Sequence, residues 1–161
     1  MFGVLWCTPS ADLDGFASWY QSDIIMDATI EARQGWGQLP QDLSKWDGFA
    51  AAMSCDLIGE TVRARVKTPL PIGKRQGRGK QQSQDWYDIL ITDCSGHTST
   101  TSWMADADIK LEFGAATAKM LGIHGHTGVP IQVYLKPSKN PRQGWIFNRL
   151  QETYDNWHKN E

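Results

Sequence analysis

Hydrophobic and polar positions alternate with a period of two in several short segments of the chain, which is typical of β-strands with one buried face. The clearest case is residues 60–68, where apolar and basic residues take turns: Val62, Ala64 and Val66 against Arg63, Arg65 and Lys67. This pattern predicts a half-buried strand. Residues 15–20, 86–94 and 129–137 are further strand candidates, and 48–55 is a run of small apolar residues.

Helical spacing is clearest late in the chain. Residues 111–123 place Phe113, Thr117, Met120 and Leu121 on one side, and Gly122 is a helix-stop residue. A second, short helix is expected over 22–33, capped by Ser22 or Asp23, with a Gly- and Pro-broken loop after it. Many short strands with one late helix favour a small β-barrel over a parallel α/β sheet.

Length, charge and composition limit the classes of function. The 161 residues suit one domain with a real core. A net charge of −2 argues against a general nucleic-acid binder, and no apolar run approaches the roughly 18 residues that a membrane span needs. The first residues, MFGVLWC, lack the basic start and long apolar stretch of a signal peptide. The eight tryptophans indicate either contact surfaces for sugar rings or a tryptophan-filled core.

Two segments stand apart from the strand pattern. Residues 69–85 are glycine-rich and carry four basic residues, Lys74, Arg75, Arg78 and Lys80. They are either a binding loop for an anionic polymer or a solvated hairpin tip. Residues 138–144 read as a linker, and the tail 145–161 has an apolar stripe at helical spacing. The stripe predicts an amphipathic helix that packs on the domain or on a protein partner.

The order of the segments resembles the double-psi β-barrel domains of the rare-lipoprotein-A-like and expansin-like families. An aromatic strand, GFASWY, is followed by AAAMSCDLIGETVRARV, then YDILITDCSGH, then IKLEFGAATAKMLGIHGHTGVPIQVYL. The family positions fall on Gly59 to Val66, Asp93, Glu112 and Leu121–Gly122. The resemblance implies a six-stranded double-psi barrel over 1–137, with insertions at 23–48 and 69–85 and one short helix at about 113–121.

The same resemblance implies a site. In such barrels the end of the Asp-bearing strand and the entry into the helix face one groove, so Asp93 and Glu112 would both point into it. Two carboxyl groups across a groove suit glycoside chemistry, and related barrels include lytic transglycosylases and expansins. Trp19, Tyr20 and Trp103 would be the platforms that bind sugar. Met53 stands where the lytic enzymes carry a histidine; His97 either takes over that role or is an exposed loop residue.

The three cysteines are too widely spaced for a zinc ribbon. Some relatives of the barrel bridge the positions of Cys55 and Cys94, so the resemblance implies that disulfide and an oxidising destination. Two free buried thiols are the alternative, and Cys7 has no evident partner. His124 and His126 are either a turn or two metal ligands; we predict no metal and no cofactor.

Two functions follow as expectations. The first is a module that binds or modifies peptidoglycan or another polysaccharide of the cell wall, with lytic transglycosylase or glycosidase-like activity through Asp93 and Glu112. The second is a non-catalytic part of a larger assembly, such as a phage virion or a surface complex, docked through its tail. Either predicts an extracellular, cell-wall or virion location. A protease inhibitor or plant-defence barrel would carry more disulfides.

Overall fold

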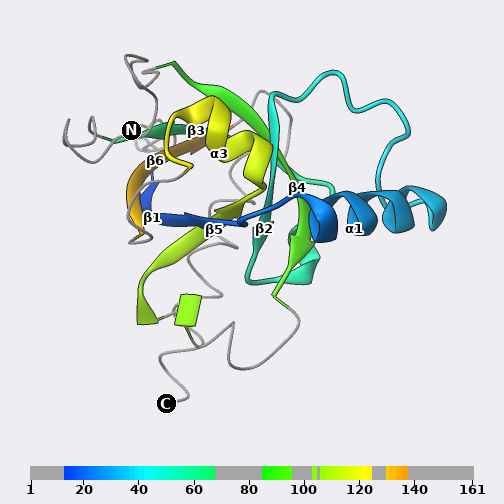
Figure 1. Cartoon of the computed structure of the whole chain (residues 1–161), viewed down its shortest axis with the longest axis horizontal. Coiled ribbons are helices and arrows are strands. Elements are labelled where there is room, and N and C mark those ends of the chain that lie inside the picture. Colours follow the sequence, from blue (N-terminus) through cyan, green and yellow to red (C-terminus); the bar gives the residue numbers. More distant parts are fainter. Residues whose placement is uncertain (1–12, 68–84, 96–102, 105, 125–129, 138–161) are drawn as a thin grey trace, which may run out of the picture.

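The computed structural model describes residues 13–67, 85–95, 103–104, 106–124 and 130–137, which form a mainly β structure (Figure 1). Its six strands are β1 (Leu13–Trp19), β2 (Gly48–Ala52), β3 (Thr61–Val66), β4 (Tyr87–Cys94), β5 (Ile109–Phe113) and β6 (Ile131–Pro137). Its helices include α1 (Ile24–Gly35), the short 3-10 helix η2 (Cys55–Leu57) and α3 (Ala115–Leu121). The prediction of a β-rich fold is confirmed.

The strands close on themselves in the order β1-β5-β2-β4-β3-β6, because β6 pairs back with β1. Two neighbouring pairs, β1 with β5 and β2 with β4, are parallel, and the other four are antiparallel. This scheme has an internal symmetry. Exchanging β1, β2 and β3 with β4, β5 and β6 returns the same neighbours in the same directions.

Alternate residues of the strands point inward and fill the barrel. On β3, Val62, Ala64 and Val66 are at most 1% exposed, as the alternation predicted. Ile131, Val133 and Leu135 of β6 are also buried, and the strand predictions for 60–68, 86–94 and 129–137 are confirmed within the described residues. Small inward-facing residues such as Ala50 and Ala52 fit the narrow interior of the barrel.

The helix expected over 111–123 is shorter than predicted. Residues 109–113 are strand β5, in which Ile109, Leu111 and Phe113 are buried and alternate with Lys110 and Glu112. The period-two signal therefore extends to Phe113 and overrides the helical spacing there. After the extended residue Gly114, α3 begins at Ala115; it ends at Leu121, with Gly122 in the left-handed conformation as its C-cap.

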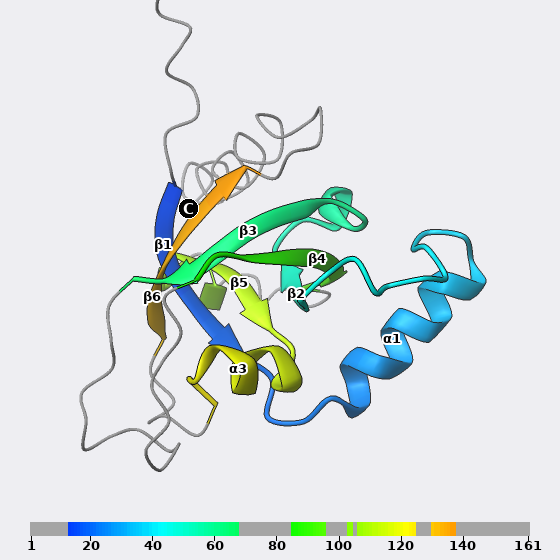
Figure 2. The ribbon, with the colours of Figure 1, turned by 90° about the horizontal axis from the view of Figure 1, so that it is seen from above.

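The expected helix at 22–33 is confirmed as α1, which continues to Gly35. Figure 2 shows α1 extending from one side of the barrel, away from β6. Its buried residues Met26 and Ile30 pack with Leu39 against Leu90, which faces outward from β4. The helix therefore covers the outer face of β4 with a second, smaller apolar cluster.

Asp23 joins α1 to α3. It stands at the N-terminus of α1 but makes no side-chain cap there. Its carboxylate instead accepts hydrogen bonds from the backbone N–H of Ala115, at 2.8 Å, and of Ala116, at 3.0 Å. Because these are orphan N–H groups of the first turn of α3, Asp23 acts as a cap for a helix that is about 90 residues away in the chain.

Several predictions concern residues outside the described ones: the loop 69–84, the linker 138–144 and the tail 145–161, and the side chains Cys7, His97 and His126. In the part of the chain that the structure describes, no helix is long and apolar enough to cross a membrane.

Candidate functional site

A β-bulge near the end of β4 decides which way Asp93 points. Ala50 of β2 pairs with Ile91, but the next residue, Ala51, pairs with Asp93, so Thr92 is an extra residue on β4. Ala50 and Ile91 both lie in the barrel core, which Ala51 does not join. Without the bulge Asp93 would follow Ile91 into the interior; with it, Asp93 shares the outward face of Ala51.

The pairing then places four residues in one row across four strands. Asp93 of β4 pairs with Ala51 of β2, Ala51 pairs with Glu112 of β5, and Glu112 pairs with Ser18 of β1. The two carboxyl groups therefore flank the smallest side chain of the row. Since neighbouring strands lie about 4.8 Å apart, their backbones are separated by roughly 10 Å, which leaves space above Ala51.

That space is a surface cavity of about 710 Å³. Its lining includes both carboxylates, Ala51, and the aromatic residues Trp19 and Tyr20 at the end of β1. Trp19 is only 7% exposed and belongs to the barrel core. Trp19 therefore lines the cavity from its buried side, whereas Tyr20 contributes a hydroxyl group to the lining.

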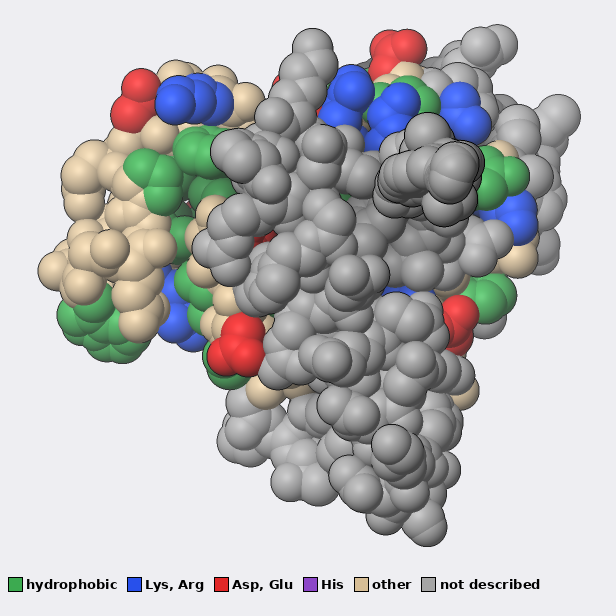
Figure 3. Space-filling model, turned by 180° about the vertical axis from the view of Figure 1, so that it is seen from behind, with side chains coloured by type: hydrophobic (Ala, Val, Ile, Leu, Met, Phe, Trp, Pro, Cys, Tyr) green, Lys and Arg blue, Asp and Glu red, His purple; other side chains and the backbone are tan. Residues whose placement is uncertain are grey.

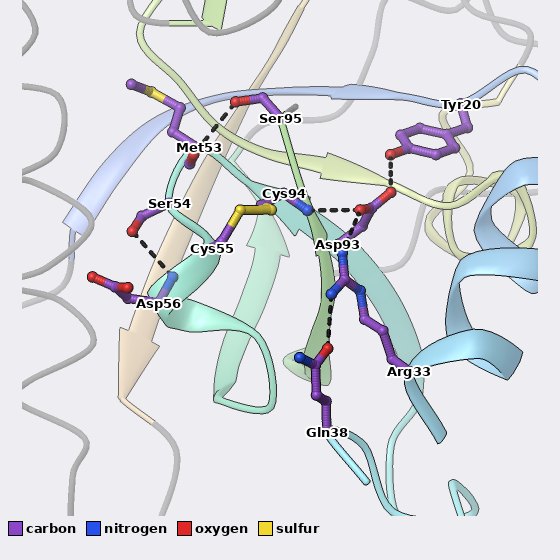
Figure 4. Close-up of a disulfide and its surroundings, with 10 residues drawn as sticks. All are labelled: Tyr20, Arg33, Gln38, Met53, Ser54, Cys55, Asp56, Asp93, Cys94 and Ser95. Atoms are coloured by element: carbon purple, nitrogen blue, oxygen red, sulfur yellow. Dashed lines mark hydrogen bonds and ion pairs between the residues drawn. A yellow bond between two sulfur atoms is a disulfide. The ribbon is translucent and has the colours of Figure 1, made fainter. Parts of the chain in front are cut away.

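Hydrogen-bond donors surround Asp93 (Figure 4). The hydroxyl of Tyr20 donates to Oδ2 at 3.0 Å, and the backbone N–H of Cys94 donates to Oδ1 at 2.8 Å. The guanidinium of Arg33, from the last turn of α1, lies 3.5 Å from Oδ1 and also donates to Gln38 at 2.9 Å. All of these partners are donors, so they suit a carboxylate that accepts.

Glu112 has a different environment. Burial raises the pKa of its carboxyl group, the Ser18 hydroxyl works in the opposite direction, and the negative charge of Asp93 raises the pKa further. Burial likewise raises the pKa of Tyr20, with smaller contributions in the same direction from the charges of Asp93 and Glu112 and from the hydrogen bond to Asp93. Tyr20 therefore stays a neutral donor at physiological pH, and Glu112 keeps its proton to a higher pH than an ordinary glutamate does.

The disulfide between Cys55 and Cys94 is present, as predicted, with the two Cα atoms 5.0 Å apart. It joins the start of η2 to the last residue of β4. Because Cys94 directly follows Asp93 and its N–H donates to that carboxylate, the bridge fixes the strand end that carries Asp93.

The remaining predicted site residues lie elsewhere. Trp103 is 45% exposed and does not line the cavity. The side chain of Met53 points away from Asp93 (Figure 4). The Nε2 atom of His124 lies 3.2 Å from the carbonyl oxygen of Gln21, a cavity residue. Among the described residues, no group of three or more His, Cys, Asp or Glu side chains is placed to hold a metal ion.

Sequence reasoning missed Arg33 and Ala51. Arg33 is one basic residue on a helix, and nothing in the local pattern shows that it reaches β4. Ala51 belongs to a run of three alanines at 50–52, of which only the middle one faces outward. The one available signal was the alternation of 48–52, which would have placed Ala51 on the face opposite Ala50 and Ala52.

We compared the chain with protein-family models, with curated proteins and with solved structures, and found no matching family model, curated protein or solved structure. Any functional conclusion therefore depends on the chemistry of the site itself.

Proposed function

We propose that the barrel is a double-psi β-barrel of the rare-lipoprotein-A-like or expansin-like type that binds and modifies a cell-wall glycan, peptidoglycan or another polysaccharide. The observation that carries this proposal is the row of Asp93, Ala51 and Glu112, all of which line the cavity. The two carboxyl groups lie on either side of the small Ala51 side chain. The symmetric strand scheme, with two parallel pairs related by exchange of the halves, supports the barrel type.

The two carboxyl groups divide the chemistry between them. Glu112, whose pKa is raised chiefly by burial, is the general acid that protonates the glycosidic oxygen. Asp93, held by Tyr20 and Arg33, is the carboxylate that supports positive charge on the sugar ring or accepts a proton. Cleavage is then of the lytic transglycosylase or glycosidase kind.

The disulfide supports the location that we propose. A structural disulfide forms and persists in an oxidising environment, so the protein acts outside the cell, at the cell wall, or in a virion.

The test is incubation of the purified protein with peptidoglycan sacculi and a panel of insoluble polysaccharides, with pelleting and soluble products both measured. We expect Asp93→Asn and Glu112→Gln each to lower product release at least about 100-fold, the usual effect of losing a general acid or base. Glu31→Gln, an exposed carboxylate on α1 away from the cavity, is the matched control and should change nothing.

Pelleting without products would make the protein a glycan-binding module, and products that persist in both variants would contradict the assigned roles. Ala51→Val sharpens the test because it narrows the gap without removing a carboxylate. We expect it to weaken pelleting while circular dichroism still shows a folded barrel.

A structural role in a larger assembly is the second candidate. Three large apolar side chains on or next to α1 favour it: Ile24, Ile25 and Trp36 are 78%, 65% and 69% exposed. Such side chains are common at protein interfaces. If neither pelleting nor products are found, replacement of Ile24 and Trp36 by Ser and deletion of residues 145–161 would show which region is needed for assembly.

A further inference from the structure

Outside the cavity, the outer face of β3 and β6 carries a series of alternating cations and aromatic rings. The ring of Tyr134 has Lys67 Nζ at 5.3 Å and Arg65 Cζ at 5.4 Å from its centroid. The ring of Trp86 has Arg65 Cζ at 5.0 Å and Lys136 Nζ at 4.2 Å. The five residues therefore form one ladder, in the order Lys67, Tyr134, Arg65, Trp86 and Lys136.

The register of the sheet builds this ladder. Arg65 of β3 pairs directly with Tyr134 of β6, Lys67 follows β3, and Trp86 directly precedes β4. The inward neighbours Ala64 and Val66 are buried, so Arg65 lies on the outward side of its strand. Figure 3 shows Lys and Arg side chains gathered along the upper edge of the molecule, in keeping with such a basic face.

The rings hold the cations in place. Each cation–π contact restrains a long, flexible side chain over a ring, which lowers the entropy that the side chain loses when it binds a ligand. The neighbouring Arg63 is paired with Asp88, with 3.3 Å between Nε and Oδ1. The ladder thus fixes three positive charges on a protein whose net charge is −2.

We propose that this ladder is a binding surface for an anionic polysaccharide, a polymer that carries carboxylate or similar charges along its length. Charge complementarity supports this assignment, because three restrained cations in series match repeated negative charges. A single-stranded nucleic acid fits less well, since it needs open aromatic faces on which bases stack, and both rings are already covered by the protein's own cations.

The surrounding sequence agrees with an anionic partner. Residues 68–84, which follow Lys67 in the sequence, carry four basic residues and no acidic one, and Asp85 stands between them and Trp86. None of the ladder residues lines the Asp93–Glu112 cavity. The proposal therefore does not depend on the chemistry proposed for that cavity.

The test is titration calorimetry of the full chain with polygalacturonate and with its fully methyl-esterified form, which has the same sugar backbone without the charges. We expect binding to polygalacturonate only, and weaker binding when salt is raised from about 0.02 M to about 0.3 M, because salt screens exposed charges. A single-stranded DNA of similar length is the third probe and should bind less tightly.

The variant Lys67→Gln/Lys136→Gln should lower the affinity for polygalacturonate at least about fivefold, because two of the three charges are lost. The matched control is Lys45→Gln/Lys119→Gln, which removes two exposed lysines elsewhere and should leave the affinity unchanged.

Three outcomes would overturn the proposal: no binding to polygalacturonate, equal binding to the methyl ester, or equal losses in the two lysine variants. Tighter binding to the DNA would assign the ladder to nucleic acid instead. A thermal unfolding measurement on each variant confirms that the protein compared is folded.

Discussion

Asp93 and Glu112 lie on either side of Ala51, but the chain surrounds the two carboxyl groups in opposite ways. Asp93 is held by three donors from three parts of the chain: Tyr20 after β1, Arg33 on α1 and the N–H of Cys94. Burial raises the pKa of Glu112, whereas the Ser18 hydroxyl lowers it. Two side chains of the same chemistry thus lie in different surroundings, and burial raises the pKa of Glu112.

The difference has a structural origin. Asp93 lies at the end of β4, where the disulfide and α1 hold the chain, whereas Glu112 lies within β5, which pairs with β1 on one side and β2 on the other. The Asp93 side is therefore held by tertiary contacts and the Glu112 side by the sheet. Substitutions that act on one side and not on the other are the means of testing this comparison.

The largest effect should come from the disulfide on the Asp93 side. The variant Cys55→Ser/Cys94→Ser should lower the free energy of unfolding by about 4 kcal/mol, the loop-closure value for a bridge across 39 residues. Urea unfolding with and without reductant measures this loss. Reductant should destabilise the wild-type protein and leave the variant unchanged; equal stability of the two proteins would contradict the expectation.

A smaller loss should follow from removing Asp23, which links the two sides by joining α1 to the start of α3. Asp23→Ala removes an acceptor for the N–H groups of Ala115 and Ala116, so we expect a loss of about 1–2 kcal/mol. Asp23→Asn keeps an acceptor oxygen and should lose less. Glu31→Gln on the exposed side of α1 is the control, and a loss of the same size there would show a general effect on the helix.

The strands of this fold were predictable because their alternation is local. Arg63, Arg65 and Lys67 mark the outer face of β3, and Val62, Ala64 and Val66 the inner one, without any knowledge of the partners. The helix boundary at 111–115 was misjudged because the residues after Gly114 have helical spacing and outweighed the shorter alternation before it. The disulfide was reached only through the resemblance to a family, and the structure confirms it.

The site was predictable only in its carboxyl groups. That Asp93 faces outward depends on the extra residue Thr92, and a bulge is a property of two paired strands, which local sequence does not record. That Arg33 reaches Asp93 depends on where α1 packs, because the two residues are 60 positions apart in the chain. Contacts of this kind are set by tertiary structure, so the partners of Asp93 could not be named beforehand.

The raised pKa of Glu112 should make the stability of the protein depend on pH. Because the folded protein holds the Glu112 proton more tightly than the unfolded chain does, stability from this group is greatest at low pH. It should decrease as the pH rises above the ordinary pKa of 4.5 towards the raised pKa of the folded protein. The loss should be about 1.4 kcal/mol for each pH unit that separates these two pKa values.

Unfolding free energies of the wild type and of Glu112→Gln between pH 4 and pH 8 measure this contribution. The difference, wild type minus variant, should decrease across that interval, because the glutamine does not titrate. A difference that is constant with pH, or one that increases, would contradict a raised pKa for Glu112.

The smallest effects should separate the two neighbours of Glu112. Ser18→Ala removes the hydroxyl that favours the charged form, so the pKa of Glu112 should rise. Asp93→Asn removes a nearby negative charge, so the same pKa should fall. We expect small changes of opposite sign in the two variants, measured by the carbon-13 chemical shift of the Glu112 carboxyl group across a pH titration. Opposite signs would show that the two sides meet across Ala51 through charge, and changes of the same sign would show that the packing of the groove had changed instead.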